Sequence, residues 1–187
     1  MSGQRGDVGT EIAPETVDDP VLAARIDDLL RRTCDLARAL TAAEQAAFKV
    51  DLDGDGTGAR KFFNLSERYD RYREYRVNPL GRGLHGLHIE AGAVVRLTQA
   101  EVERHPAWEA FGTQAGSHPP MRGWLATPVC SEDGDRPQYG LLQLSDKAGG
   151  QDFSPDDGAR LVELAAFAGA TLDALRHAAD SRSGIER

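Results

Sequence analysis

Hydrophobic residues recur at helical spacing near both ends of the chain. After Asp19 and a proline, apolar positions three and four residues apart continue to about residue 41. A second stripe of this kind begins after Ser154, which is again followed by a proline, and continues to about residue 178. Asp and Ser are preferred helix caps, and proline is favoured in the first helical position. The pattern therefore predicts two long amphipathic helices, 20–41 and 155–178.

Between these helices, short apolar runs bounded by Gly, Pro and Asp predict β-strands. Two shorter helices are also predicted: one follows Ser66, and the other begins at Thr98, where Glu101 completes a capping box, and is interrupted by Pro106. The architecture predicted is α+β, a central antiparallel sheet of about six strands flanked by helices, with the N- and C-terminal helices packed together on one face. The predicted strands are 44–50, 59–65, two short pieces around Ala91-Gly92, 124–130 and 139–147.

The stretch DLDGDGTG resembles the first half of a calcium-binding EF-hand loop. Asp51, Asp53 and Asp55 alternate as the ligands of such a loop do, and Gly56 follows. The twelfth position, which should hold a bidentate glutamate, is Phe62. Asp-Gly steps between apolar runs are typical of a hairpin turn, so we predict a β-hairpin here and not a calcium site.

The order of these elements predicts one domain with polar ends. Residues 1–19 are predicted to be a disordered tail, residues 20–178 the folded domain, and residues 179–187 a polar tail. The N-terminal residues lack the apolar segment of a secretory signal, and no apolar run approaches the ~18–20 residues that span a bilayer. We therefore expect a cytoplasmic protein that has no membrane partner.

The 187 residues carry a net charge of −8, which argues against nucleic acid as a partner. The two cysteines, Cys34 and Cys130, cannot form a disulfide scaffold or a four-thiolate metal site, and no CxxC motif supports redox activity at Cys130. The sequence also lacks a Ser-His-Asp order, metal-spaced histidines and a glycine-rich phosphate loop. We expect a non-enzymatic protein with no cofactor and no bound metal.

The C-terminal half resembles a GAF domain, a family common in bacterial sensor proteins. The matching motifs are Arg122–Ala126 (RGWLA), Gly140–Lys147 (GLLQLSDK) and Phe153–Asp157 (FSPDD). The resemblance extends over about residues 24–178. It implies a bacterial sensory or regulatory module for signal transduction, with a ligand pocket between the sheet and the segments that connect its strands.

GAF domains with an NK…FxxxDE signature hold a structural pair between the lysine and the first acid. The matching residues here are Lys147 and Asp157, whereas Asp146 replaces the usual Asn and Gly158 replaces the usual Glu. The signature accompanies cyclic-nucleotide GAF domains, so a cyclic-nucleotide sensor stays an alternative. The role that the resemblance implies for the pair is to hold the fold together.

A haem sensor is a second alternative, because certain GAF domains hold haem through one histidine. Four histidines fall in the region of the pocket, but a strand at 85–88 would point His85 and His88 to opposite faces. The cysteines do not match the pocket thiols of GAF-type methionine-sulfoxide reductases or the attachment site of bilin-binding members. The four histidines are His85, His88, His105 and His118.

The expected pocket combines aromatic residues, histidines and arginines. Its aromatic members could also be ordinary core residues, and Arg82 and Arg122 would be the members that bind an anionic ligand. The candidate ligand-binding residues are Tyr72, Arg82, His88, Trp108, Phe111, His118, Arg122 and Trp124.

Two functional hypotheses follow. In the first, a small-molecule ligand shifts a homodimer or a contact with a signalling protein. In the second, side chains close the pocket and the domain acts by dimerisation or partner binding alone. Both place the interface on residues 20–42 and 155–178. A cavity of about a few hundred Å³ would favour the first hypothesis.

Overall fold

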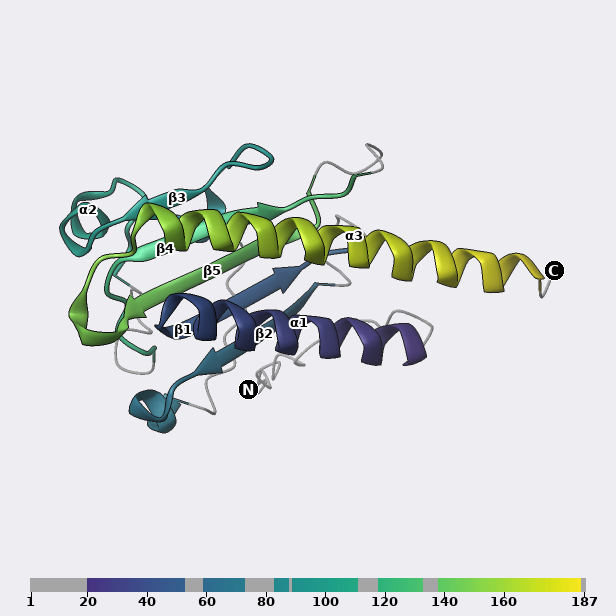
Figure 1. The fold of residues 1–187 in the computed structure, drawn as a ribbon, viewed down its shortest axis with the longest axis horizontal. Helices are drawn as coiled ribbons and strands as arrows, with labels where there is room; N and C mark the ends of the chain where they lie inside the picture. The colour runs from purple at the N-terminus through teal and green to yellow at the C-terminus, as the bar shows by residue number, and fades with distance from the viewer. Residues whose placement is uncertain are drawn as a thin grey trace, which may run out of the picture.

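A computed structural model places helices on one face of a five-stranded antiparallel sheet (Figure 1). It describes residues 20–52, 59–72, 83–87, 89–110, 118–132 and 138–185. The α-helices are α1 (Pro20–Thr41), α2 (Gln99–Arg104) and α3 (Pro155–Ile185). The strands are β1 (Ala43–Val50), β2 (Arg60–Leu65), β3 (Val95–Leu97), β4 (Trp124–Val129) and β5 (Gly140–Lys147). Three 3-10 helices complete the set: η1 (Glu67–Tyr72), η2 (Gly83–Gly86) and η4 (Ala148–Gly150).

The strands lie in the order β2-β1-β5-β4-β3, and every neighbouring pair is antiparallel. The α+β architecture predicted from the sequence is confirmed, with five strands in the described part of the chain against about six expected. The two strands furthest apart in sequence that pair directly are β1 and β5, at the centre of the sheet. The centre of the sheet therefore forms only when the two ends of the domain meet.

The hairpin predicted around DLDGDGTG is confirmed by its strands. β1 and β2 pair antiparallel from Gln45 opposite Leu65 to Val50 opposite Arg60. Residues 53–58, which carry most of the calcium-like pattern, lie outside the described residues.

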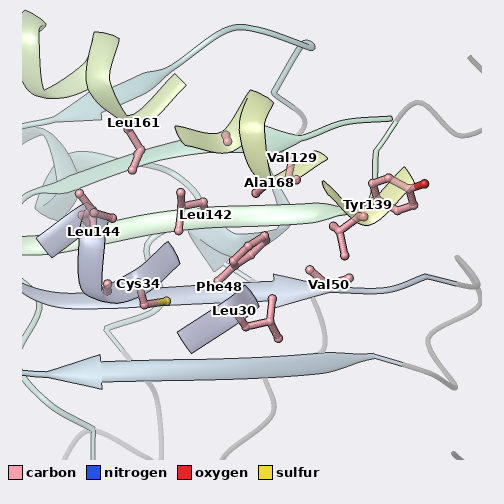
Figure 2. Close-up of a cluster of buried hydrophobic side chains, with 14 of the residues drawn as sticks. Leu30, Cys34, Phe48, Val50, Val129, Tyr139, Leu142, Leu144, Leu161 and Ala168 are labelled. Atoms are coloured by element: carbon pink, nitrogen blue, oxygen red, sulfur yellow. The ribbon is translucent and has the colours of Figure 1, made fainter. Parts of the chain in front are cut away.

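Helices α1 and α3 run side by side, in opposite directions, over one face of the sheet (Figure 1). The guanidinium of Arg160, near the start of α3, donates to the carbonyl of Leu40, at the end of α1, over 3.0 Å. The main core fills the space between this pair and the sheet, with Phe48 and Leu142 between the helices and the central strands (Figure 2). The predicted packing of the terminal helices on one face is confirmed.

A second, smaller core covers the opposite face of the sheet. Trp124 and Leu141 of the sheet contact Val102 of α2 and Leu84 of η2 in this cluster. Thr98 caps α2 through the predicted capping box with Glu101. The segment between β2 and β4 therefore forms the cover over this face, where the sequence resemblance places a pocket.

Three details differ from the sequence predictions. The strand predicted before Ala91 is wrong in its first residues, because Gly83–Gly86 forms the 3-10 helix η2. The short helix after Ser66 is a 3-10 helix, and α3 continues to Ile185, beyond the expected end at 178.

The predicted tail 1–19 lies outside the described residues. No helix among those described is both long and apolar enough to cross a membrane.

Candidate functional site

The face of the sheet opposite α1 and α3 holds a small cavity of about 20 Å³. Trp124 is one of the residues that line it, is fully buried, and donates its indole N–H to Gln143 Oε1 over 3.1 Å. A cavity of this size has room for about one water molecule and not for a typical ligand, which needs about 300 Å³ or more. The residues that line it are Gln45, Ala46, Ala47, Phe63, His118, Met121, Trp124, Gln143, Leu144 and Ser145.

Among the histidines that the structure describes, His118 lines this cavity. Burial lowers the pKa of its imidazole to about 4, a hydrogen bond to the Pro119 carbonyl opposes the shift, and the positive charge of Lys61 adds to it. The ring nitrogen Nδ1 lies 2.6 Å from that carbonyl oxygen. At neutral pH the imidazole is uncharged, so it can take part in hydrogen bonding but not in charge pairing.

The structure separates the other candidate ligand-binding residues. The ring of Tyr72 lies 6.2 Å from that of Tyr69, at the edge of η1. Trp108 packs half-buried against the second core, and the side chain of Arg122 is exposed. Of the five candidates that lie in the described part of the chain, His118 and Trp124 line the cavity. Arg82, His88 and Phe111 lie outside the described residues.

Sequence reasoning missed the polar residues of the central strands. Gln45 of β1 and Gln143 and Ser145 of β5 all line the cavity. Gln45 donates through Nε2 to the carbonyl of Pro120 over 2.5 Å, which ties the strand to the loop that carries His118. The signal that could have found them is the polar residue at every second position of a central strand, where an apolar residue is expected.

Lys147 and Asp157, predicted as a structural pair, are in contact: Nζ lies 2.5 Å from Oδ2. Asp157 Oδ2 also accepts from the backbone N–H of Ser154 over 2.7 Å, and Ser154 Oγ caps the start of α3. Burial would raise the pKa of the Asp157 carboxyl, but the hydrogen bonds from Lys147 and Ser154 outweigh it and hold this pKa below its ordinary value. The pair thus fastens the end of β5 to the first turn of α3.

The residue before this lysine, Asp146, adopts a left-handed backbone conformation with φ of 57° and is fully buried. Tyr69 donates its hydroxyl to Asp146 Oδ2, and Arg68 Nη1 lies 4.0 Å from the same oxygen. Burial raises the pKa of this carboxyl, partly offset by the charge of Arg68. Asp and Asn tolerate the left-handed region better than most residues, which suits this position.

A match to a family model decides the identity of the domain. Residues 23–173 match the model described as "GAF domain". The chain belongs to the GAF domain family. This confirms the resemblance found in the sequence.

Solved GAF domains share the fold of this one. The blue-light absorbing form of the Thermosynechococcus elongatus PixJ GAF domain matches with a TM-score of 0.66 and 14% identity, covering 91% of this chain and 98% of that chain. NpR6012g4, a red/green cyanobacteriochrome, matches with a TM-score of 0.59 and 11% identity, covering 81% of this chain and 96% of that chain. At such identities the likeness extends to the fold alone.

A GAF-fold neighbour also comes from a two-component signalling protein. A domain described as part of a sensor histidine kinase protein from Sinorhizobium meliloti 1021 matches with a TM-score of 0.53 and 14% identity. The match covers 84% of this chain and 96% of that chain. Almost the whole of each matched structure is therefore represented in this GAF domain.

The described part of this GAF domain brings no three His, Cys, Asp or Glu side chains together as a metal site. His105 accepts a hydrogen bond at Nδ1 from the backbone N–H of Ala107 over 3.1 Å, which closes a local turn after α2. The strand geometry expected for His85 is wrong, because this residue lies in η2. His88, its proposed neighbour, lies outside the described residues.

Both cysteines are free thiols, and they lie in different places. Cys34 is fully buried in the main core, where burial raises its pKa far above the ordinary value, and Cys130 is half-buried at the end of β4. Burial raises the pKa of Cys130 as well. Since the thiolate is the reactive form, neither cysteine is activated for nucleophilic or redox chemistry.

Proposed function

We propose that this GAF domain is a non-enzymatic regulatory module for signal transduction that acts through a homodimer formed by α1 and α3. A signalling protein that binds the same helices is the related alternative. The observation that carries the proposal is a group of exposed apolar side chains on these two helices. It agrees with the use of GAF domains in sensor proteins.

The exposed apolar residues lie along the junction of the helices. Leu36 and Leu40 of α1 are 50% and 48% exposed, and Phe167 of α3 is 64% exposed. Leu40 meets α3 at Arg160, and Phe167 lies two turns after Arg160 on the same side of α3. Because the helices run in opposite directions, Leu36 and Phe167 lie in the same direction from that meeting point.

We name Leu36, Leu40 and Phe167 the helix-junction patch. The sheet covers the inner side of α1 and of the N-terminal part of α3, and Figure 1 shows no described element over the outer side of the two helices. Large exposed hydrophobic residues that cluster on adjoining helices are typical of protein–protein contact sites. A second copy would bring the same patch to a twofold axis and bury it on both sides.

A ligand-sensing role on the opposite face is the second candidate function. Its support is the polar lining of the cavity by Gln45, Gln143 and Ser145 beside an uncharged His118. The volume of about 20 Å³ instead favours the closed-pocket hypothesis for this conformation. A ligand of ordinary size would have to displace side chains or bind beside the cavity. Haem and cyclic nucleotides stay alternatives of this kind.

The dimer is tested by sedimentation velocity of the full chain over a range of concentrations. We expect the wild-type protein to dimerise and Phe167→Glu to be monomeric, because the substitution would bury a charge at the interface. Ala166→Glu is the matched control: it adds the same charge to the exposed side of α3 one residue away and should leave dimerisation unchanged. A wild-type monomer, or equal weakening by both variants, would contradict the homodimer.

Ligand sensing is tested by native mass spectrometry of the purified protein together with its absorption spectrum. A retained small-molecule mass supports the sensing role, and a Soret band identifies haem. A dimer of apo mass alone supports the interaction role through the helix-junction patch.

A further inference from the structure

Two lysines lie directly opposite each other in the sheet. Lys49 of β1 pairs in register with Lys61 of β2. Their neighbours Phe48, Val50 and Phe62 pack into the core under α1 and α3. Because successive side chains of a strand point to opposite faces, both lysines point to the cavity face. Directly opposite residues have Cβ atoms about 5 Å apart, so the two ammonium groups can reach a common point.

This pair has an unfavourable electrostatic arrangement on its own. Like charges in directly opposite positions of a sheet are destabilising, and among the described residues no carboxylate forms an ion pair with either lysine. Lys61 Nζ instead lies over the ring of Phe63, 4.3 Å from its centroid. Burial, and next the charge of Lys49, lower the pKa of Lys61 to about 7.

The pair adjoins the cavity. Phe63, under the Lys61 ammonium, lines the cavity, and the charge of Lys61 acts on His118, another of its lining residues. The amides of Gln45 and Gln143 lie on the same face. Two positive charges therefore lie beside a cavity lined by amide side chains and the Phe63 ring, and within the described part of the chain no carboxylate pairs with them.

We propose that Lys49 and Lys61 bind a small oxyanion, a carboxylate or a phosphate-like group, at the edge of the cavity. An anion between two ammonium groups replaces one repulsion with two charge-assisted hydrogen bonds, and each lysine has three donors for it. The inference deepens the ligand-sensing part of the proposed function and rests on it. It does not need the cavity to enlarge, because the charged group binds beside the cavity.

Binding should be linked to the protonation of Lys61. The anion favours the ammonium form, so affinity should be higher at pH 6 and fall as the pH rises to 9 and Lys61 loses its proton. Among the described residues, the other titratable group at the cavity beside this pair is His118, whose pKa of about 4 keeps it neutral over this range. Lys61 is then the group whose titration changes the affinity.

The test is a titration of the uniformly 15N-labelled full chain with sodium sulfate, followed by amide NMR shifts, against sodium chloride at equal ionic strength. Sulfate does not change its charge between pH 6 and 9. A second titration with acetate distinguishes a carboxylate site from a tetrahedral oxyanion site. We expect saturable shifts centred on β1 and β2, and affinity about 10-fold or more weaker in Lys61→Met and Lys49→Met.

Arg25→Met is the matched control, since it removes one positive charge from an exposed position of α1. It should bind sulfate as the wild type does. Dispersed amide spectra of the lysine variants show that they remain folded. Absence of saturable shifts with both anions, or equal weakening in Arg25→Met, overturns the proposal.

The two proposals fail separately. Dimerisation that depends on Phe167, with no saturable anion binding, leaves the regulatory dimer in place and removes the anion site. Saturable anion binding that depends on Lys61, in a protein that is monomeric, leaves the anion site in place and removes the regulatory dimer.

Discussion

Lys147 Nζ lies 2.5 Å from Asp157 Oδ2, and this contact joins the last residue of β5 to the first turn of α3. The side chains are 16% and 3% exposed, so the pair is largely withdrawn from solvent. Breaking one partner of a buried pair costs more than removing both, since it leaves a charge without compensation. The pair therefore stabilises the attachment of the longest helix to the centre of the sheet.

Lys147→Met should lower the free energy of unfolding by about 1–3 kcal/mol, and Lys147→Met/Asp157→Asn should cost less than the two single changes added together. Because the pKa of Asp157 is lowered in the folded state, its contribution is present above about pH 4 and is lost as the pH falls through the folded pKa. Urea unfolding at pH 7 and pH 3 measures both effects. Strict additivity of the two changes would contradict the coupling.

At Gly169, α3 passes close to the backbone of Cys130, the residue after β4. A Cβ atom there would lie 2.1 Å from the carbonyl oxygen of Cys130, at the end of β4. Gly169→Ala should therefore destabilise the domain by about 1–3 kcal/mol, because the helix or the strand end must move. Thermal unfolding measures the change.

Gly158→Ala is the control within the same helix. Its Cβ would contact Val94 at an ordinary 3.4 Å, so the better helix propensity of Ala should leave stability unchanged or raise it by up to about 1 kcal/mol. Equal losses in both variants would show that close packing against Cys130 does not explain the glycine at 169.

Asp173 of α3 accepts three hydrogen bonds at the same end of β4 as Gly169. It accepts from Ser131 Oγ over 2.7 Å, from the Glu132 N–H over 2.9 Å and from the Tyr139 hydroxyl over 2.5 Å. Asp173→Asn should cost about 1–3 kcal/mol, because the amide group puts N–H donors where acceptors are needed. Asp180→Asn, at an exposed position of the same helix, should be neutral.

The same network has a pH signature. Burial would raise the pKa of Asp173, but the hydrogen bonds from Tyr139, Ser131 and Glu132 outweigh it and lower this pKa. Stability from Asp173 is therefore full above about pH 4 and is lost on further acidification. Between pH 7 and pH 3, the free energy of unfolding should fall less in Asp173→Asn than in the wild type. An equal fall in both proteins would contradict this account.

Lys61→Met should stabilise the anion-free protein at low pH more than at high pH. The folded pKa of Lys61, about 7, lies below its unfolded value of about 10.5, so folding opposes protonation of this lysine. The resulting loss of stability is full below pH 7 and disappears as the pH approaches 10. Urea unfolding of both proteins in chloride at pH 6 and pH 10 measures this difference in the free energy of unfolding. An increase in Lys61→Met that is the same at both pH values would show that the lowered pKa of Lys61 is not its cause.

The secondary structure that depends on local signals could be predicted from the sequence. The caps at Ser154 and Thr98, the prolines after the helix starts and the Asp-Gly steps near Asp51 all act within a few residues, and they predicted α1, α2, the start of α3 and the β1–β2 hairpin. The segment around His85 was misjudged, because its short apolar spacing suits a strand and a 3-10 turn alike.

The candidate site was predicted less well. A sequence motif predicted that Lys147 and Asp157 form a pair, and the structure places them in contact. Pocket residues chosen by residue type were dispersed instead: Tyr72 lies at η1 and Arg122 points to solvent, while Gln45 and Gln143 line the cavity. Residue type does not reveal which side chains meet when their elements are far apart along the chain.

The sequence by itself determined the helices, the hairpin and the GAF family, because periodicity, capping and short motifs are local properties of the chain. Only the tertiary structure decided the pairing of β1 with β5, the closing of the cavity and the meeting of the end of α1, at Leu40, with Arg160 of α3. Lys49 and Lys61 illustrate the difference. Each is an ordinary polar position in its own strand, and the charge they concentrate exists only because strand register places them opposite each other.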